Sequence, residues 1–220
     1  MTLDLASLGW DADFAAAYVR HDVRGHRPVR VTQVDQGVTT ALGASGSCRA
    51  SLGGGALLRA ARDPLAMPAV GDWAVVRTWP DRRVTLEAVL PRRTQLIDFD
   101  GPGRAVAANL DVAAVIEPLD GSPDRGRIER LLSLAWDSGA RPILLLTKCD
   151  LVRDPDAIAA ELAASVPALE VIPISARTGV NLDRLHPFIG PGQTLGLLGS
   201  AGAGKTTLVN ALSRASVLAL

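Results

Sequence analysis

The sequence has no net charge, few cysteines and no long apolar run. Its 220 residues include 23 basic and 23 acidic side chains, which argues against a nucleic-acid binder that relies on bulk positive charge. The two cysteines, Cys48 and Cys149, are far apart, which excludes a disulfide framework and a zinc spacing, so both are expected to be free thiols. No stretch of about 18 apolar residues occurs, and the N-terminus lacks the pattern of a signal peptide. We therefore expect a cytoplasmic protein that does not associate with membranes.

Lysine is also rare. Only two of the 23 basic residues are lysine, Lys148 and Lys205, and the others are arginine. Arginine does not easily replace lysine where a slim, flexible ammonium is needed, so these two positions are candidates for a specific role. Hydrophobic residues make up 48% of the chain, which is enough for a buried core and excludes a disordered protein.

The N-terminal half predicts a small β-barrel. Residues 3–20 carry apolar side chains at mixed helical spacing, which predicts a short helix or arm. From Pro28 to about Pro91 the pattern changes to short β-rich runs separated by turns, and five or six such strands are typical of an oligonucleotide-binding (OB) barrel. The runs are VRVTQV, VTTAL, SCRASL, ALLRAA (56–61), DWAVVRTW and RVTLEAVL. We expect residues 1–106 to form the arm and the OB-fold barrel.

The C-terminal half predicts an α/β domain. It contains near-continuous apolar runs, of the kind shown by parallel strands that are covered on both faces. These runs are residues 111–118, 142–148, 170–175 and 194–199, and the helical patterns between them are 127–139, 154–166 and 181–189. Alternation of strand and helix is typical of a doubly wound sheet. We expect residues 107–220 to form this domain.

A phosphate-binding loop follows the last predicted strand. The sequence matches the pattern G-x-x-x-x-G-K-S/T between the apolar strand TLGLLG and the helix TTLVNALS, the context in which this motif binds phosphate. The glycines let backbone N–H groups converge on an anion, Lys205 would reach the β and γ phosphates, and Thr206 would bind Mg²⁺. The residues predicted to bind the phosphates of a nucleotide are Gly199, Ser200, Ala201, Gly202, Ala203, Gly204, Lys205, Thr206 and Thr207.

Two further motifs favour GTP over ATP. Thr147-Lys148-Cys149-Asp150 directly follows a predicted buried strand and resembles the guanine-recognition motif N/T-K-x-D of GTPases. The carboxylate of Asp150 would accept from guanine N1–H and the exocyclic amine, and the stem of Lys148 would pack along the base. Such a carboxylate would be unpaired with adenine, a mismatch that can discriminate by roughly 10⁴-fold.

The second guanine motif lies at the end of the next predicted strand. There Ser175-Ala176 begins a stretch that resembles the companion S-A-x-x-G loop, in which the backbone N–H of Ala176 would bond guanine O6. Thr147 replaces the commoner asparagine, so we expect weaker bracing rather than loss of guanine binding. The residues predicted to bind guanine are Thr147, Lys148, Cys149, Asp150, Ser175 and Ala176.

The order of these motifs points to a particular family. In most GTPases the phosphate loop comes first, but here it follows the guanine motifs, so we expect a circularly permuted P-loop GTPase domain. This order behind a β-barrel resembles the ribosome small-subunit-dependent GTPase family of the RsgA type. The stretches that carry the resemblance are Val70–Trp73, Leu90–Arg93, Ala107–Asp111, Gly139 and Gly199–Leu212.

The resemblance implies a GTP-hydrolysing factor that uses Mg²⁺ and acts in late maturation of the small ribosomal subunit. Its expected partners are GTP or GDP, that subunit, which would stimulate hydrolysis, and the rRNA of the subunit, which the barrel would contact. We expect a monomer. No side chain is an evident general base, which suits phosphoryl transfer that depends on positioning and electrostatics.

Family members continue into switch I, switch II and a zinc-binding domain, whereas this chain stops at Leu220. We therefore expect a GTPase domain that is incomplete at the C-terminus, with no zinc ligands, with the strand at 194–199 as an open edge, and with weak or absent activity on its own. Asp100-Gly101-Pro102-Gly103 matches the switch II pattern D-x-P-G by letters. Because only residues 104–110 separate it from the next strand, too few for a switch helix, we predict an interdomain turn there.

The arginines of the barrel are candidates for RNA contact, with a solvated surface as an equal alternative because acidic residues are interleaved with them. They are Arg24, Arg27, Arg30, Arg49, Arg59, Arg62, Arg77, Arg82, Arg83, Arg92 and Arg93. Two other functions stay open. One is a non-hydrolysing RNA-binding module with an inert nucleotide domain, and the other is an ATPase or small-molecule kinase, which Lys148 and Asp150 disfavour.

Overall fold

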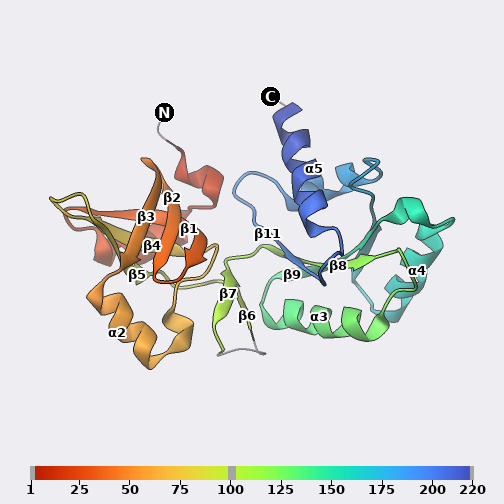
Figure 1. The fold of residues 1–220 in the computed structure, drawn as a ribbon, viewed down its shortest axis with the longest axis horizontal. Helices are drawn as coiled ribbons and strands as arrows, with labels where there is room; N and C mark the ends of the chain where they lie inside the picture. The colour runs from red at the N-terminus through yellow and green to blue at the C-terminus, as the bar shows by residue number, and fades with distance from the viewer. Residues whose placement is uncertain (1–2, 99–102, 219–220) are drawn as a thin grey trace. The chain divides into compact units, whose positions relative to one another are not determined.

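The structure is a computed structural model that describes residues 3–98 and 103–218, with side chains up to Ser213. The chain divides into two compact units (Figure 1). One comprises the residues up to Leu110 together with Pro191–Thr194, and the other comprises Asp111–Gly190 and the residues from Leu195. The expected fold class, a small barrel followed by an α/β domain, is confirmed. Asp100, Gly101 and Pro102 of the predicted interdomain turn lie outside the described residues.

Five short strands close the barrel of the first unit. They are β1 (His26–Asp35), β2 (Val38–Gly43), β3 (Gly46–Leu52), β4 (Trp73–Thr78) and β5 (Val84–Val89). Their order round the barrel is β1-β2-β3-β5-β4, with β4 also paired to β1, and all pairs are antiparallel except β3 with β5. Alternate side chains point inward and fill the interior. The buried side chains of this core include Val29, Val31, Ala41, Ala50, Ala74, Val76 and Leu86.

The run ALLRAA, expected as a strand, lies in helix α2 (Gly54–Arg62). The strand prediction is wrong because Ala, Leu and Arg are strong helix formers and the run contains no β-branched residue. The helix buries Ala56 against the barrel core and leaves Leu57 and Leu58 exposed. A short 3₁₀ helix, η3 (Pro64–Ala66), follows it in the connection toward β4.

The N-terminal arm packs on the barrel through aromatic side chains, which confirms the short helix or arm expected there. It contains the 3₁₀ helices η1 (Leu5–Leu8) and η2 (Val19–His21) on either side of α1 (Ala12–Tyr18). Helix α1 begins at Ala12 because the Asp11 carboxylate accepts a hydrogen bond from the backbone N–H of Phe14. Trp10 lies edge-on to the buried Trp73, with ring centroids 4.7 Å apart, so the arm covers this side of the barrel.

A buried ion pair fixes the end of the barrel. Arg92 donates to both carboxylate oxygens of Asp72 at 2.8 Å, and also to the backbone carbonyls of Leu65 and Met67 at 2.7 Å. The side chains of Arg92 and Asp72 are 10% and 0% exposed. The prediction of RNA contact is therefore wrong for Arg92, because its guanidinium is used inside the fold.

Arg30 has a similar structural role. It is buried and donates to the backbone carbonyls of Gly71 and Asn109 and to the hydroxyl of Thr194. The N–H of Gly192 in turn donates to the carbonyl of Ser7 in the arm, at 3.2 Å. The prediction of RNA contact is wrong for Arg30 too, because its guanidinium is buried. The hydrogen bonds of Thr194 and Gly192 attach residues 191–194 to the first unit.

Four parallel strands form the sheet of the second unit. They are β8 (Val112–Pro118), β9 (Arg141–Thr147), β10 (Glu170–Pro173) and β11 (Leu195–Leu198), in the order β10-β9-β8-β11. The helices of this unit are α3 (Arg125–Asp137), α4 (Pro155–Ser165) and α5 (Lys205–Leu218). Among the described strands β11 pairs only with β8 and forms an edge of this sheet.

Two segments differ from the sequence expectation. Residues 181–189, expected as a helix, form the 3₁₀ helix η5 (Leu182–Phe188), since Pro187 has no N–H and cannot continue an α-helical ladder. The antiparallel pair β6 (Gln95–Ile97) and β7 (Ala105–Ala108) in the first unit was not expected, because each strand is too short to show a pattern. None of the helices within residues 3–98 and 103–218 is long and apolar enough to cross a membrane.

Candidate functional site

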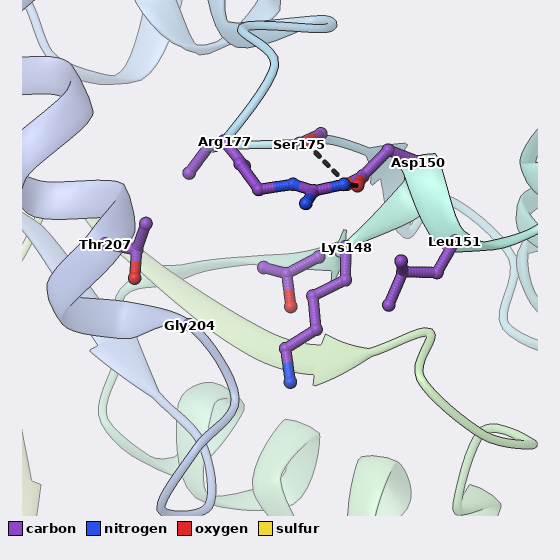
Figure 2. A pocket seen from close by; sticks show the side chains of 9 residues that line it. Lys148, Asp150, Leu151, Ser175, Arg177, Gly204 and Thr207 are labelled. Atoms are coloured by element: carbon purple, nitrogen blue, oxygen red, sulfur yellow. Dashed lines mark hydrogen bonds and ion pairs between the residues drawn. The ribbon is translucent and has the colours of Figure 1, made fainter.

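The nucleotide motifs meet at one edge of the parallel sheet. Strands β9, β10 and β11 all end there, and in parallel sheets ligands bind outside the carboxyl ends of the strands. A cavity of about 290 Å³ opens at this edge (Figure 2). It is lined by Thr147, Lys148, Asp150, Leu151, Ser175, Ala176, Arg177, Gly204 and Thr207. Its volume is near the lower end of the range for small-molecule sites, about 300–1,000 Å³.

The phosphate loop has the backbone that its glycines predict. Gly202 and Gly204 have φ angles of 77° and 95°, in the left-handed region that favours glycine. The loop ends where α5 begins at Lys205, so the first N–H groups of the helix have no partners within it and are directed at an anion site. The ammonium of Lys205 donates to the carbonyls of Gly199 and Ser200 at 2.7 Å, so it is held over the loop.

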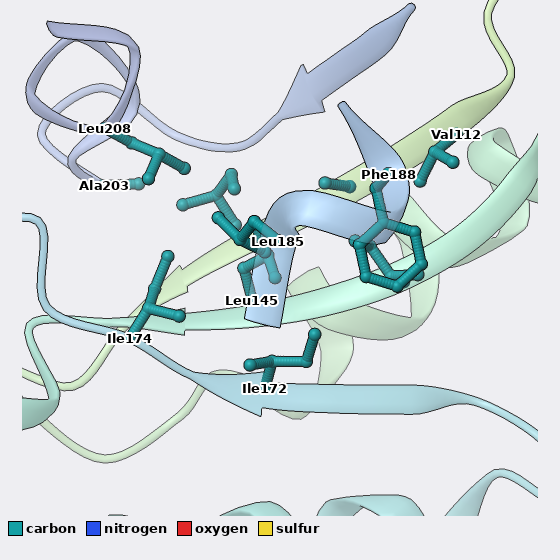
Figure 3. Packing of buried hydrophobic residues seen from close by; sticks show 11 residues of the cluster. Val112, Leu145, Ile172, Ile174, Leu185, Phe188, Ala203 and Leu208 are labelled. Carbon is teal, nitrogen blue, oxygen red and sulfur yellow. The ribbon is translucent and has the colours of Figure 1, made fainter. Parts of the chain in front are cut away.

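The core beneath the site supports this loop. Ala203 in the loop and Leu208 in α5 are buried in the same cluster as Leu145 of β9 and Ile174, which follows β10 (Figure 3). The loop is therefore anchored by the packed face of the sheet that carries the guanine motifs.

Gly199 lies too close to Ile116 of β8 to accept a side chain. A Cβ atom there would lie 2.8 Å from the carbonyl oxygen of Ile116 and 3.0 Å from its Cβ, so β11 or the loop would have to move. We expect Gly199→Ala to lower nucleotide affinity at least about tenfold, measured by titration with a fluorescent GDP. Gly126→Ala is the matched control, since its Cβ would meet only an ordinary contact at 3.7 Å. Equal affinity of the two variants would contradict the prediction.

Thr147 joins the guanine motif to the phosphate loop. Its side chain is buried at the end of β9, and its hydroxyl donates to the carbonyl of Ala203 at 2.6 Å. A threonine therefore supplies a brace where asparagine is commoner, which agrees with the expectation that a hydroxyl still forms a hydrogen bond here.

Lys148 is held by a residue that the sequence analysis missed. Its backbone φ of 59° is unusual for a residue other than glycine. Its ammonium forms an ion pair with Asp120, which lies two residues after β8. The hydrogen bond from Lys148 lowers the pKa of Asp120 below its ordinary value. The signal available in the sequence was an acidic residue just after a predicted buried strand, at the sheet edge where ligands bind.

The side chain of Asp150 is 14% exposed, although the residue as a whole is exposed, and both of its carboxylate oxygens accept hydrogen bonds. Ser175 donates its hydroxyl to Oδ1 at 2.6 Å, and Arg177 donates to Oδ2 at 2.7 Å. These two hydrogen bonds, that from Ser175 first, lower the pKa of Asp150 below its ordinary value of 3.8. Arg177 was not among the predicted site residues, because its position in the motif S-A-x-x-G is variable.

A flat pH profile follows from this environment. A carboxyl whose pKa is lowered in the folded chain stays ionised above it, and loses its charge only as the pH falls through that lowered value. We expect guanosine binding to be constant between about pH 8 and pH 5 on account of Asp150. Guanosine is the suitable probe because phosphate groups titrate near pH 6. A loss of affinity with a midpoint near pH 6 to 7 would contradict the prediction.

The remaining predicted residues lie close to this cavity with different roles. The thiol of Cys149 is buried, which raises its pKa, and the residue is not among those that line the cavity. Ala176 lines the cavity in the turn after β10. Thr206 is exposed in the first turn of α5, where its hydroxyl is accessible.

The hydroxyl of Thr206 is the protein oxygen that would bind Mg²⁺ here, together with oxygens of the nucleotide phosphates. No group of three or more His, Cys, Asp or Glu side chains that could hold a metal occurs in the described part of the chain. Mg²⁺ does not require one, because it is commonly bound through one or two protein oxygens and the phosphates of the substrate. A structural zinc ion needs four Cys or His ligands, and the described residues do not supply them.

Known proteins are similar to this chain in sequence and in fold. The family model described as RsgA GTPase matches residues 89–220. A curated relative from Streptomyces coelicolor, named small ribosomal subunit biogenesis GTPase RsgA, is 39% identical over 215 residues, which cover 94% of this chain. The chain spans 57% of the length of that relative.

Two solved structures are similar in fold. They are a crystal structure of YjeQ from Thermotoga maritima and one of YloQ, titled a circularly permuted GTPase, each 22% identical to this chain. The TM-scores are 0.66 and 0.62, and the matches cover 85% and 89% of this chain and 65% and 67% of those chains. The family match includes the phosphate loop and both guanine motifs in their permuted order, and from this we conclude that the chain belongs to the RsgA GTPase family.

Proposed function

We propose that this chain binds GTP and GDP, and that the protein to which it belongs hydrolyses GTP with Mg²⁺ and acts in maturation of the small ribosomal subunit. The observation that carries the proposal is a single cavity that has the Asp150 carboxylate at one end and the phosphate loop, through Gly204 and Thr207, at the other. A guanine nucleotide would contact Asp150 with its base and the phosphate loop with its phosphates.

At the base end, Asp150 would accept hydrogen bonds from N1–H and the exocyclic amine of guanine. Lys148 would pack its alkyl stem along the base, with Asp120 fixing the ammonium. The N–H of Ala176 would donate to guanine O6. Adenine has no donor at N1, so it offers no hydrogen bond that could replace the one from Arg177 to Oδ2 of Asp150.

At the phosphate end, the N–H groups of the loop and of the first turn of α5 would bond the phosphate oxygens. Lys205 donates to two carbonyls in the loop, and its third N–H would reach a phosphate. Thr206 and Thr207 complete this end, and the hydroxyl of Thr206 would hold Mg²⁺. The metal ion, when bound, neutralises charge on the β and γ phosphates.

The ribosomal part of the proposal rests on the relatives and on the barrel. The Streptomyces coelicolor relative is named as a small ribosomal subunit biogenesis GTPase, and the barrel has a fold that commonly binds nucleic acid. Some arginines of the barrel have exposed side chains that could reach rRNA: Arg24, Arg49, Arg62 and Arg82. We propose that binding to the small subunit stimulates GTP hydrolysis by the whole protein.

Titration with fluorescent GDP and ADP tests the nucleotide part. A preference for GDP of about 100-fold or more supports the proposal. Equal affinity would indicate an ATPase or a small-molecule kinase, and binding of neither would leave the barrel as an RNA-binding module. GTP turnover measured with and without purified small ribosomal subunits tests the ribosomal part, and turnover that the subunits do not raise would contradict it.

A further inference from the structure

Arg177 occupies the acceptor that guanine recognition requires. Its guanidinium donates to Oδ2 of Asp150 at 2.7 Å, while the hydroxyl of Ser175 takes Oδ1 at 2.6 Å. Figure 2 shows the side chain of Arg177 reaching from the turn after β10 to the carboxylate of Asp150. The base end of the cavity therefore contains a cation where the edge of guanine would bind.

The chemical groups that compete for this carboxylate are closely related. In guanine, C2 is bonded to N1, N3 and the exocyclic nitrogen, so the edge that would face Asp150 is itself a guanidine unit. An arginine side chain presents the same array of coplanar N–H donors to a carboxylate. A carboxylate oxygen can accept two hydrogen bonds, so Oδ1 can accept from Ser175 and from guanine together. The contested atom is Oδ2, where the guanidinium of Arg177 takes the place of the second donor of guanine.

We propose that Arg177 is an internal competitor for guanine: it mimics the guanine edge, closes the base site when the nucleotide is absent, and has to leave Asp150 before GTP or GDP binds. The proposal rests on the proposed function, since it concerns the same site. It makes Arg177 a residue that sets the affinity and the rate of nucleotide binding.

The surroundings of Arg177 suit a contact that forms and breaks. Its side chain is 75% exposed, whereas that of Asp150 is 14% exposed, so the arginine can move into solvent without disturbing a core. The turn does not depend on the arginine side chain. Gly179 donates its N–H to the carbonyl of Ser175 at 2.9 Å, and Thr178 donates its N–H to the hydroxyl of Ser175 at 3.2 Å.

The expected size of the effect follows from competition. When only a fraction of the molecules has the free carboxylate, the apparent dissociation constant rises by the inverse of that fraction. Ion pairs with one exposed partner are weak, so we expect Arg177→Met to lower the Kd for GDP about two- to fivefold. We expect the lower Kd to come from faster association of GDP, with an unchanged dissociation rate.

Stopped-flow binding of a fluorescent GDP to the 220-residue chain tests the proposal. Arg184→Met, in η5, is the matched control, because it removes the same charge from an exposed side chain that does not line the cavity. Arg177→Lys keeps the charge but lacks the planar fork, and is expected to fall between the intact chain and Arg177→Met. Affinity for ADP should not rise in any variant, because adenine does not use the contested carboxylate.

The possible results separate this proposal from the proposed function. If the intact chain prefers GDP but Arg177→Met leaves its Kd unchanged or raises it, Arg177 is not a competitor, and only this inference fails. If the intact chain binds GDP no better than ADP, the proposed function fails and the inference fails with it. Faster association in Arg177→Met and an unchanged rate in Arg184→Met would support both.

Discussion

Asp150→Asn is expected to lower the affinity for GDP at least about 100-fold while leaving the affinity for ADP within about twofold. The variant replaces a carboxylate that accepts two hydrogen bonds with an amide that offers one acceptor and one donor. The amide donor would then face N–H groups of guanine, so the site would contain unpaired polar groups. Titration of the intact chain and the variant with fluorescent GDP and ADP measures both changes.

Two comparisons make this result specific to the base edge. Asp183→Asn removes the same charge from an exposed position in η5 and should leave both affinities unchanged. Inosine diphosphate lacks the exocyclic amine of guanine, so the intact chain should bind it more weakly than GDP, and Asp150→Asn should reduce that preference. If Asp150→Asn bound GDP as the intact chain does, the carboxylate would have no part in base recognition.

Asp72→Ala is expected to destabilise the barrel unit by about 3–5 kcal/mol, because it leaves the buried guanidinium of Arg92 without its counter-charge. The ion pair of Asp81 with Arg83 offers a control of the same chemistry at the surface, with side chains 53% and 75% exposed. Asp81→Ala should change the stability by less than about 1 kcal/mol.

Urea unfolding followed by tryptophan fluorescence measures these changes. The barrel unit contains three of the four tryptophans, Trp10, Trp73 and Trp79, so the signal is dominated by that unit. A loss below about 1 kcal/mol in Asp72→Ala would mean that water or another group compensates Arg92. It would also remove the reason for treating Arg92 as part of the fold rather than as an RNA contact.

The nucleotide motifs were predictable because each is local in sequence. The loop from Gly199 to Thr206 is specified by its own residues, because two of its glycines have φ angles in the left-handed region. The carboxyl ends of parallel strands lie at the same edge of the sheet, so motifs that follow the strands are brought together there. The same locality explains why the four apolar runs were recognised as strands. The error at 56–61 has the opposite cause, since the β-rich pattern of the neighbouring runs was extended to a run of Ala, Leu and Arg whose own propensity is helical.

Partner choice among the arginines could not be predicted. Arg30 is buried, Arg92 is paired with a buried carboxylate, Arg177 contacts a carboxylate in the cavity, and Arg62 is exposed. In the sequence all four are arginines among mixed charges. Their partners are distant in the chain, as with Arg30 and Thr194. Charge composition alone therefore overstated the number of arginines available to RNA.

The attachment of Pro191–Thr194 to the first unit bears on the order in which the protein can be completed during synthesis. Chains emerge from the ribosome N-terminus first, and domains generally fold as they emerge. All five barrel strands have been synthesised once the chain reaches Val89, but Thr194, whose hydroxyl accepts from Arg30, is translated more than a hundred residues later. Three strands of the parallel sheet, β8, β9 and β10, are translated in that interval. The last contacts of the N-terminal unit can therefore form only after most of the nucleotide unit exists, so a ribosome-bound nascent chain that ends before residue 191 would present a closed barrel with an incompletely fastened arm.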